Sequence, residues 1–261
     1  MTDYLRDLPI TEVAAWYRRL ANAVATQRIG GEEPLAARFL RLYLENRDSG
    51  YTCNTIDAPN YLRNSPLVID ELRYHRRVFL TEERARMTGR PARWVGILPR
   101  LQGLPGFLRW NPSQQLQMEY NSLVEMPLRF QVTGTREEQD LLTSLRGFQL
   151  KSSVLVRGTS VGGAGRIRIN FVSWWCRVID RYDFDYSEHF TVPNPDFRST
   201  RPTAVRPMDE RITVYHSNAQ RLERAGQAAP FNIEMEWQLT DLTITGPADV
   251  DPSRSLSSWP F

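Results

Sequence analysis

The chain has 261 residues, of which 41% are hydrophobic and 24% charged, with a formal net charge of +3. This composition is typical of a soluble globular chain of one large or two modest domains, and it excludes a disordered, collagen-like or disulfide-stapled protein. Acidic residues are interspersed among the basic ones and no apolar run reaches about 18 residues, so we expect neither a nucleic-acid partner nor a transmembrane segment.

The first third of the chain is expected to be helical. Thr11 is a candidate N-cap, and apolar residues follow it at helical spacing, at Val13, Trp16, Tyr17, Leu20 and Val24. A second helix is expected from Pro34. The run from Pro66 to Leu80 has apolar ends, but its polar centre leaves its conformation open, and we expect His75 there to be solvated. Another short helix is expected to start at Thr81.

The pattern changes after residues 89–112, whose prolines and glycines indicate an irregular connector. Nearly every even position from Leu116 to Val132 is apolar, which predicts half-buried strands, with Ser122 as the exception near a break. Further strands are expected at 148–156, 166–183, 212–216 and 231–239, with a glycine-rich hairpin at 158–165, helices at 136–145 and 217–226, and a surface tail from Gly246.

These elements predict an α+β fold. We expect a mainly helical N-terminal region at residues 1–112, including the loop-rich connector, and a β-rich C-terminal domain at residues 113–261. The strands of that domain would form an antiparallel β-sheet or a partly closed β-barrel. Cys53 and Cys176 are far apart in the sequence, and two free thiols are expected rather than a disulfide.

The densest group of reactive side chains lies where the long strand at 166–183 ends. It contains Asp180, Tyr182, Asp183 and His189. A carboxylate beside a histidine suits general acid–base chemistry, and two carboxylates can hold a divalent cation against a phosphate. The structural alternative is that these side chains only cap turns at the strand exit. His216, at another strand end, could pair with His189 across the sheet or cap the helix that follows.

The order and gaps of these residues resemble the D-x-Y-D-x5-H-R signature of the colicin M family. The resemblance implies a magnesium-dependent hydrolysis of the lipid-linked peptidoglycan precursor on the periplasmic side, with Asp180 and Asp183 as metal ligands. It makes Asp180, Tyr182, Asp183 and His189 the candidate catalytic residues. Phe190 stands where the family has arginine.

An arginine further along the chain would then have to supply the missing charge. Arg198 is our candidate for this catalytic role, and Arg201 is the alternative. Arginine suits it because its planar guanidinium can bind a phosphate through two hydrogen bonds.

The function expected from these residues is that of a bacteriocin-like antibacterial toxin, a metal-dependent hydrolase of a lipid-linked, phosphate-containing envelope precursor with Mg²⁺ as cofactor. The first residues show no secretory signal, so we expect a cytoplasmic protein in the producer that a contact-dependent secretion machine or a lysis route delivers to the periplasm of a target cell. An immunity protein would be a further partner. The alternative is a non-catalytic interaction module, such as an adaptor, immunity or accessory protein of a secretion system.

Overall fold

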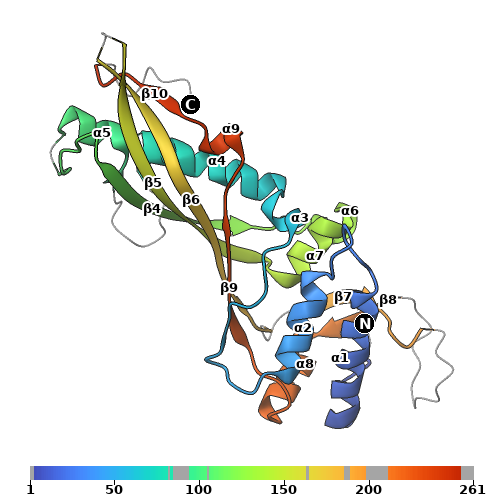
Figure 1. The fold of residues 1–261 in the computed structure, drawn as a ribbon. Coiled ribbons are helices and arrows are strands. Elements are labelled where there is room, and N and C mark those ends of the chain that lie inside the picture. Colours follow the sequence, from blue (N-terminus) through green and yellow to red (C-terminus); the bar gives the residue numbers. More distant parts are fainter. Residues whose placement is uncertain are drawn as a thin grey trace. The chain divides into compact units, whose positions relative to one another are not determined.

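The computed structural model describes residues 3–81, 83–84, 94–104, 106–162, 165–184, 189–197 and 211–253 (Figure 1). The helices in these ranges are α1 (Ile10–Ala25), α2 (Leu35–Glu45), α3 (Asn60–Arg63), α4 (Pro66–Leu80), α5 (Ile97–Gln102), α6 (Phe130–Thr133), α7 (Arg136–Ser144), α8 (His216–Arg224) and α9 (Leu242–Thr245). The strands are β1 (Thr52–Cys53), β2 (Glu83–Arg84), β3 (Trp94–Val95), β4 (Gln115–Glu125), β5 (Gly147–Val161), β6 (Arg166–Tyr182), β7 (His189–Pro193), β8 (Arg211–Tyr215), β9 (Phe231–Gln238) and β10 (Ala248–Val250).

The chain divides into two compact units that are interleaved along the sequence. Unit 1 contains residues 1–61, 125–147 and 180–234, and unit 2 contains residues 62–124, 148–179 and 235–261. Strands β6 and β9 contribute residues to both units. Each of these two units contains residues from both sides of residue 112. The division into domains that we expect at residue 112 stays a prediction.

The principal sheet is mixed and its described strands do not close into a barrel. The strand order is β1-β9-β6-β5-β4, with β10 also paired to β6. The pairs β5–β6 and β6–β10 are antiparallel, whereas β1 lies parallel to β9 through Thr52↔Asn232 and Cys53↔Ile233. The predicted combination of helices and strands, with a helical first part before the sheet, is confirmed. The expected antiparallel sheet or partly closed barrel is wrong for the described strands, because a two-residue strand from the helical third joins one edge in parallel and β4 remains at the other.

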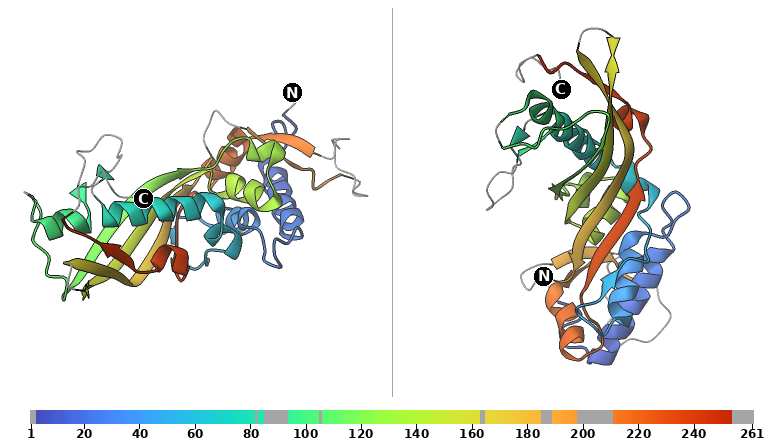
Figure 2. Two further views of the ribbon diagram at one scale, coloured as in Figure 1. Left: turned by 90° about the horizontal axis from the view of Figure 1, so that it is seen from above. Right: turned by 60° about the vertical axis from the view of Figure 1, so that its left-hand side comes forward.

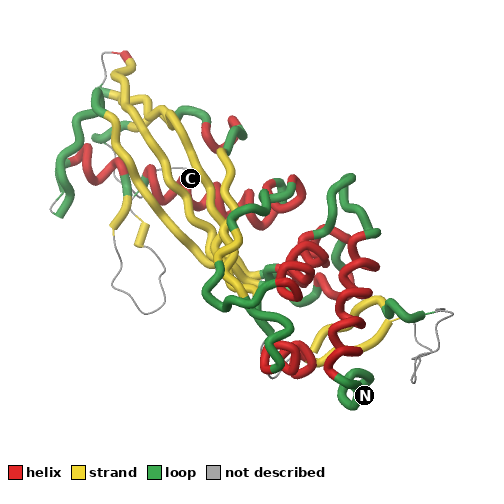
Figure 3. The backbone as a smooth tube through the Cα atoms, turned by 60° about the horizontal axis from the view of Figure 1, so that its bottom comes forward, coloured by secondary structure: helices red, strands yellow, loops and turns green. Residues whose placement is uncertain are grey.

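Unit 1 packs its helices around a cluster of aromatic side chains. Helix α1 contacts α2 and α8, and α2 contacts α7. Figure 3 shows the two-stranded ribbon of β7 and β8 among these helices, with β7 in contact with α1. Helix α1 begins at Ile10 after Pro9 and has no side-chain cap, so the cap expected at Thr11 is wrong. The rings at the centre of the unit belong to Phe39, Tyr43, Tyr182, Phe184 and Phe231.

Asp140 on α7 supplies the N-terminal cap that α2 cannot make for itself. The residue before α2 is Pro34, whose side chain has no acceptor. The two carboxylate oxygens of Asp140 accept hydrogen bonds from the backbone amides of Leu35 and Ala36, at 2.9 and 3.0 Å, and one also accepts from the Tyr61 hydroxyl at 2.6 Å. Asp140 is only 7% exposed, and burial raises the pKa of its carboxyl. A buried acid thus fixes the start of a helix more than a hundred residues away.

Unit 2 is built around the long parts of β4, β5 and β6, with α4 lying across one face of these strands (Figures 1 and 2). Phe79 of α4 packs edge-on against Trp174 of β6, with ring centroids 5.5 Å apart, and both side chains are almost fully buried. Burial of each such side chain stabilises the fold by about 1.5–3 kcal/mol. The other face carries polar pairs, including Lys151 with Glu119 at 2.8 Å.

His75 lies in the core of unit 2 and not in solvent, so our expectation for it was wrong. Its imidazole nitrogens lie 2.7 Å from the Ser152 hydroxyl and 2.6 Å from the Ser122 hydroxyl. The Trp174 indole donates a hydrogen bond to Ser152 at 3.0 Å. Because the sheet offers two serines to this face of α4, a polar residue can be buried with both nitrogens paired. Burial lowers the pKa of His75 from 6.5 to about 3.

Acid is therefore expected to destabilise unit 2. The unfolded chain binds a proton at His75 near pH 6.5, whereas the folded chain does so only near pH 3, so stability contributed by the neutral imidazole falls as the pH drops through this window. At pH 4 the loss should be on the order of 3 kcal/mol. Urea unfolding measured from pH 7 to pH 4 should show it, and a His75→Phe variant should show a flatter profile. Equal slopes for the two proteins would contradict the prediction.

The segment expected as strands from 116 to 132 is a strand only in its first part. β4 runs unbroken through Asn121 and Ser122 and ends at Glu125, and Phe130 then begins the short helix α6. Gly134 ends that helix, and a Cβ atom at this position would come within 2.6 Å of the Phe130 carbonyl oxygen.

The prediction of a surface tail from Gly246 is also partly wrong, because β10 pairs with β6. Cys53 and Cys176 are free, as predicted.

Candidate functional site

The motif strand places Tyr182 in the core of unit 1. Alternation along β6 puts Asp180 and Tyr182 on one face, toward the helices. Tyr182 is 9% exposed, and its ring stacks on Phe231 with centroids 5.3 Å apart and lies edge-on to Phe184 at 5.5 Å. Burial raises the pKa of its hydroxyl. The ring of Tyr182 thus anchors the end of β6, and its catalytic role stays a prediction.

Asp180 is a half-buried carboxyl with an altered proton affinity. Its pKa is raised from 3.8 to about 7, mainly by burial; a hydrogen bond from the Arg181 backbone amide opposes the shift, and the charge of Asp183 contributes to it. A group that titrates near neutral pH can both accept and release a proton under physiological conditions. Asp180 is therefore the described motif residue best suited to general acid–base chemistry.

Asp183 lies beyond the end of β6 and is exposed. Its carboxylate pairs with Arg181, whose Nε is 3.4 Å from Oδ2. The Arg181 guanidinium also donates to the Asn232 side chain at 3.1 Å and to the Ser49 carbonyl at 3.4 Å. No role was predicted for Arg181, which lies within the reactive cluster, although its two-residue spacing from Asp183 was the available signal. A fixed cation thus lies next to one of the two motif carboxylates.

His189 is the first residue of β7 and is exposed. The register of the β7–β8 pair places it opposite Tyr215, with ring centroids 5.7 Å apart. The turn after β7 is anchored by Arg19 of α1, whose guanidinium makes two hydrogen bonds to the buried carboxylate of Asp196, at 2.8 and 3.0 Å. The strand that carries His189 is thereby attached to the longest helix of unit 1.

The described residues bring only part of the predicted site together. Asp180 and Asp183 interact electrostatically, and His189 lies beside Tyr215. The β7–β8 register aligns His189 with Tyr215, and the His216 ring lies against Phe184, so the pairing of His189 with His216, one of the two alternatives for His216, stays a prediction. Arg198 and Arg201 lie outside the described residues, so their predicted role is untested.

The magnesium site stays a prediction. Within the described ranges, no three His, Cys, Asp or Glu side chains gather as a metal site. Mg²⁺, however, is commonly held by one or two carboxylates together with phosphate oxygens and water. Asp180 and Asp183 fit that donor set, and a bound cation would favour the ionised form of Asp180 against the burial and the like charge that raise its pKa.

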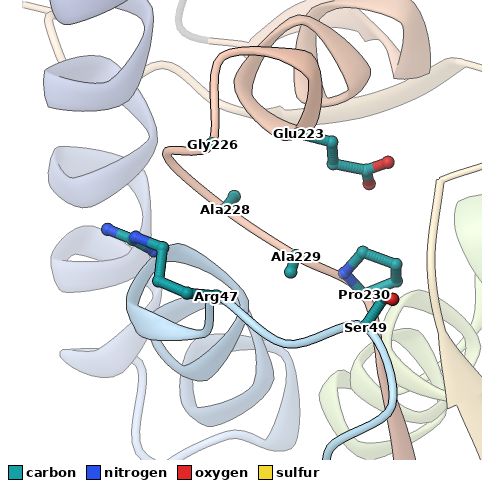
Figure 4. A pocket seen from close by; sticks show the side chains of 7 residues that line it. All are labelled: Arg47, Ser49, Glu223, Gly226, Ala228, Ala229 and Pro230. Carbon is teal, nitrogen blue, oxygen red and sulfur yellow. The ribbon is translucent and has the colours of Figure 1, made fainter.

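Unit 1 also contains a cavity of about 400 Å³ between the segment after α2 and the segment after α8 (Figure 4). Arg47 and Glu223 lie at opposite sides of it, and small residues form the rest of its wall: Ser49, Gly226, Ala228, Ala229 and Pro230. The Glu223 carboxylate already accepts a hydrogen bond from the Tyr43 hydroxyl at 2.7 Å. None of the described candidate residues lines this cavity.

Comparison with known proteins gives little beyond the motif. No family model and no curated protein sequence matches the chain. A solved structure that matches is that of PaeM, a colicin M-like bacteriocin produced by Pseudomonas aeruginosa, with 14% sequence identity and a TM-score of 0.28. The match covers 84% of this chain and 51% of PaeM, so the chain spans about half the length of that protein. Within the described residues, no helix is long and apolar enough to cross a membrane.

Proposed function

We propose that the chain is an antibacterial toxin that hydrolyses a lipid-linked, phosphate-containing envelope precursor at a site centred on Asp180. The observation that carries the proposal is the half-buried Asp180 carboxyl at the end of β6, whose pKa is raised to about 7 beside Asp183. This is the residue that the colicin M-like motif assigns to the site. The fold alone does not favour this activity over another, so the proposal rests on the side chains of Asp180 and Asp183.

The proposed reaction is the transfer of the phosphate end of the precursor to water. Water adds to phosphorus, the bond from phosphorus to the isoprenoid oxygen breaks, the proton of the water passes to Asp180, and His189 gives a proton to the departing oxygen. Arg181 fixes Asp183, and an arginine outside the described residues would neutralise phosphate charge. Bound Mg²⁺, held by Asp180 and Asp183, would supply charge stabilisation at the phosphate.

The remaining parts of the proposal concern where the toxin acts. The precursor is exposed on the periplasmic side, so the chain would act there after delivery by a secretion machine, and the producer would need an immunity protein. These partners and this location stay proposals that follow from the substrate.

Expression in a bacterial host with and without a periplasmic signal tests the proposal. The wild type is expected to lyse cells only when exported, and Asp180→Ala to be harmless in both compartments. Asp70→Ala is the matched control, because Asp70 is an exposed acid on α4 that pairs only with neighbouring Arg73 among the described residues. It should kill like the wild type. Equal growth of all strains, with folded protein in each, would overturn the toxin and favour the interaction module.

A further inference from the structure

The segment from Tyr215 to Gln220 contacts the motif at both of its described ends. This segment contains the last residue of β8 and the first turns of α8. One end of the motif is Asp183 with the adjacent Phe184, and the other is His189 at the start of β7. A segment that contacts both ends can therefore fix Asp183 and His189 together.

Gln220 holds the Asp183 end. It is 3% exposed, and its side-chain amide donates a hydrogen bond of 2.6 Å to the carbonyl oxygen of Phe184. Phe184 is the residue directly after Asp183, so this bond acts on the backbone that carries the carboxylate. The Phe184 ring is also enclosed, by Tyr43 at 4.9 Å and His216 at 5.2 Å between centroids. The exit from β6 is therefore fixed by one buried polar bond and by aromatic packing.

Tyr215 holds the His189 end. The two residues are paired in the β7–β8 ladder, and their rings lie 5.7 Å apart. A ring beside an imidazole limits the rotamers that the imidazole can adopt and changes its solvation. His216 follows Tyr215 directly and contacts Phe184, so adjacent residues of one segment reach both ends of the motif.

We propose that Tyr215 and Gln220 are positioning residues of the Asp180 site, with Gln220 fixing the backbone at Asp183 and Tyr215 orienting His189. The inference rests on the proposed function. Misplacement of a reacting group by about 1 Å can reduce a rate about a hundredfold, so residues that hold both ends of the motif should affect turnover more than substrate binding.

Gln220→Met tests the first contact. It keeps the length of the side chain and removes the amide group that donates a hydrogen bond to the carbonyl oxygen of Phe184. The expected result is a fall in kcat of about tenfold to a hundredfold with KM changed less than about twofold. Gln139→Met is the matched control. Gln139 of α7 donates a similar bond, of 3.0 Å, to the carbonyl of Gly134 away from the motif. It should keep the wild-type kcat.

An NMR measurement keeps the inference testable without turnover. The chain has three histidines, so the ring signals of His189 can be assigned, and Tyr215→Leu should shift them while leaving those of His75 unchanged, because the Tyr215 ring lies 5.7 Å from that of His189. Gln220→Met should shift the backbone amide signals of residues 180–184, and Gln139→Met should not. If the wild type hydrolyses the precursor but neither variant changes kcat or these signals, the inference is wrong and the function stands. If the wild type is inactive, the proposed function fails and the signals alone decide the positioning.

Discussion

Replacement of Asp180 with asparagine is expected to reduce turnover by about 10²–10⁴-fold and, above pH 7, to make unit 1 more stable. Loss of a general base typically costs about 10²–10⁴-fold in rate, and the amide cannot accept the proton of the attacking water. Stability should change in the opposite sense, because the folded chain ionises Asp180 only near pH 7 whereas the unfolded chain does so near its ordinary value of 3.8. A residue required for chemistry would then be unfavourable for folding.

The sign of this effect follows from proton linkage. Above pH 7 both states are ionised and the folded state carries the whole cost of the half-buried charge. As the pH falls from 7 toward 3.8 the folded state gains a proton first, so the wild type becomes more stable. Asp180→Asn removes this slope. At pH 8 it should stabilise the protein by on the order of 2 kcal/mol, after allowance for partial exposure.

Urea unfolding at pH 5 and pH 8 measures the difference, with exposed Asp70→Asn as the control that should change neither value. A variant that loses activity and also loses stability at pH 8 would contradict the account of Asp180 as a strained carboxyl. It would indicate that the side chain is needed to hold the strand end, which is the role assigned by the turn-capping alternative.

Asp140→Ala is expected to have the largest effect on stability in unit 1. The change removes the acceptor of three hydrogen bonds. It leaves the Ala36 amide and the Tyr61 hydroxyl without this acceptor, and the Leu35 amide keeps only its bond to the Tyr61 hydroxyl, at 3.0 Å. The expected loss is about 3–5 kcal/mol in the free energy of unfolding. Thermal and urea unfolding of the variant measure it directly.

Thr135→Ala is the control for an ordinary cap. Thr135 and Glu138 form a capping box at the start of α7, on the exposed side of the same helix. Its loss should cost only about 1 kcal/mol. Similar effects of the two variants would show that Asp140 acts merely as a local cap and that its contacts with α2 and Tyr61 contribute little.

Local patterns predicted the strands well because each carries its own two-residue period. The alternation around Phe148, Ile167 and Ile233 corresponds to β5, β6 and β9, and the capped helix from Arg136 corresponds to α7. The glycine-rich turn between β5 and β6 was also predicted, with Val161 paired to Arg166 across it. Such features depend only on residues that are neighbours in the sequence, so the pattern of a single sequence is enough to predict them.

The failures involve partners that are distant in sequence. The polar centre of α4 looked solvent-exposed because the serines that pair with His75 lie on two other elements. Ser122 was in fact the one even position of its run that broke the apolar pattern, and this was the available signal. The parallel bridge of Cys53 to Ile233 and the cap from Asp140 left no comparable trace.

The same distinction applies to the candidate site. The motif residues were found by their spacing, and the position of Asp180 at the end of a long strand agrees with that reading. Tyr215 and Gln220 were not selected, because their relation to the motif arises from the β7–β8 register and from a bond to a backbone carbonyl. Every residue has a backbone carbonyl, so the sequence does not indicate that the carbonyl oxygen of Phe184 is the one that accepts this hydrogen bond.

The interleaving of the units has a consequence for synthesis. Residues 231–234 of β9 belong to unit 1 and residues 235–238 to unit 2, so both depend on a strand near the carboxyl end. During translation neither unit can be completed before β9 has left the ribosomal exit tunnel. Maturation of Asp180 and its surroundings must therefore follow the synthesis of β9, and a polypeptide that stops before β9 would contain neither unit in complete form.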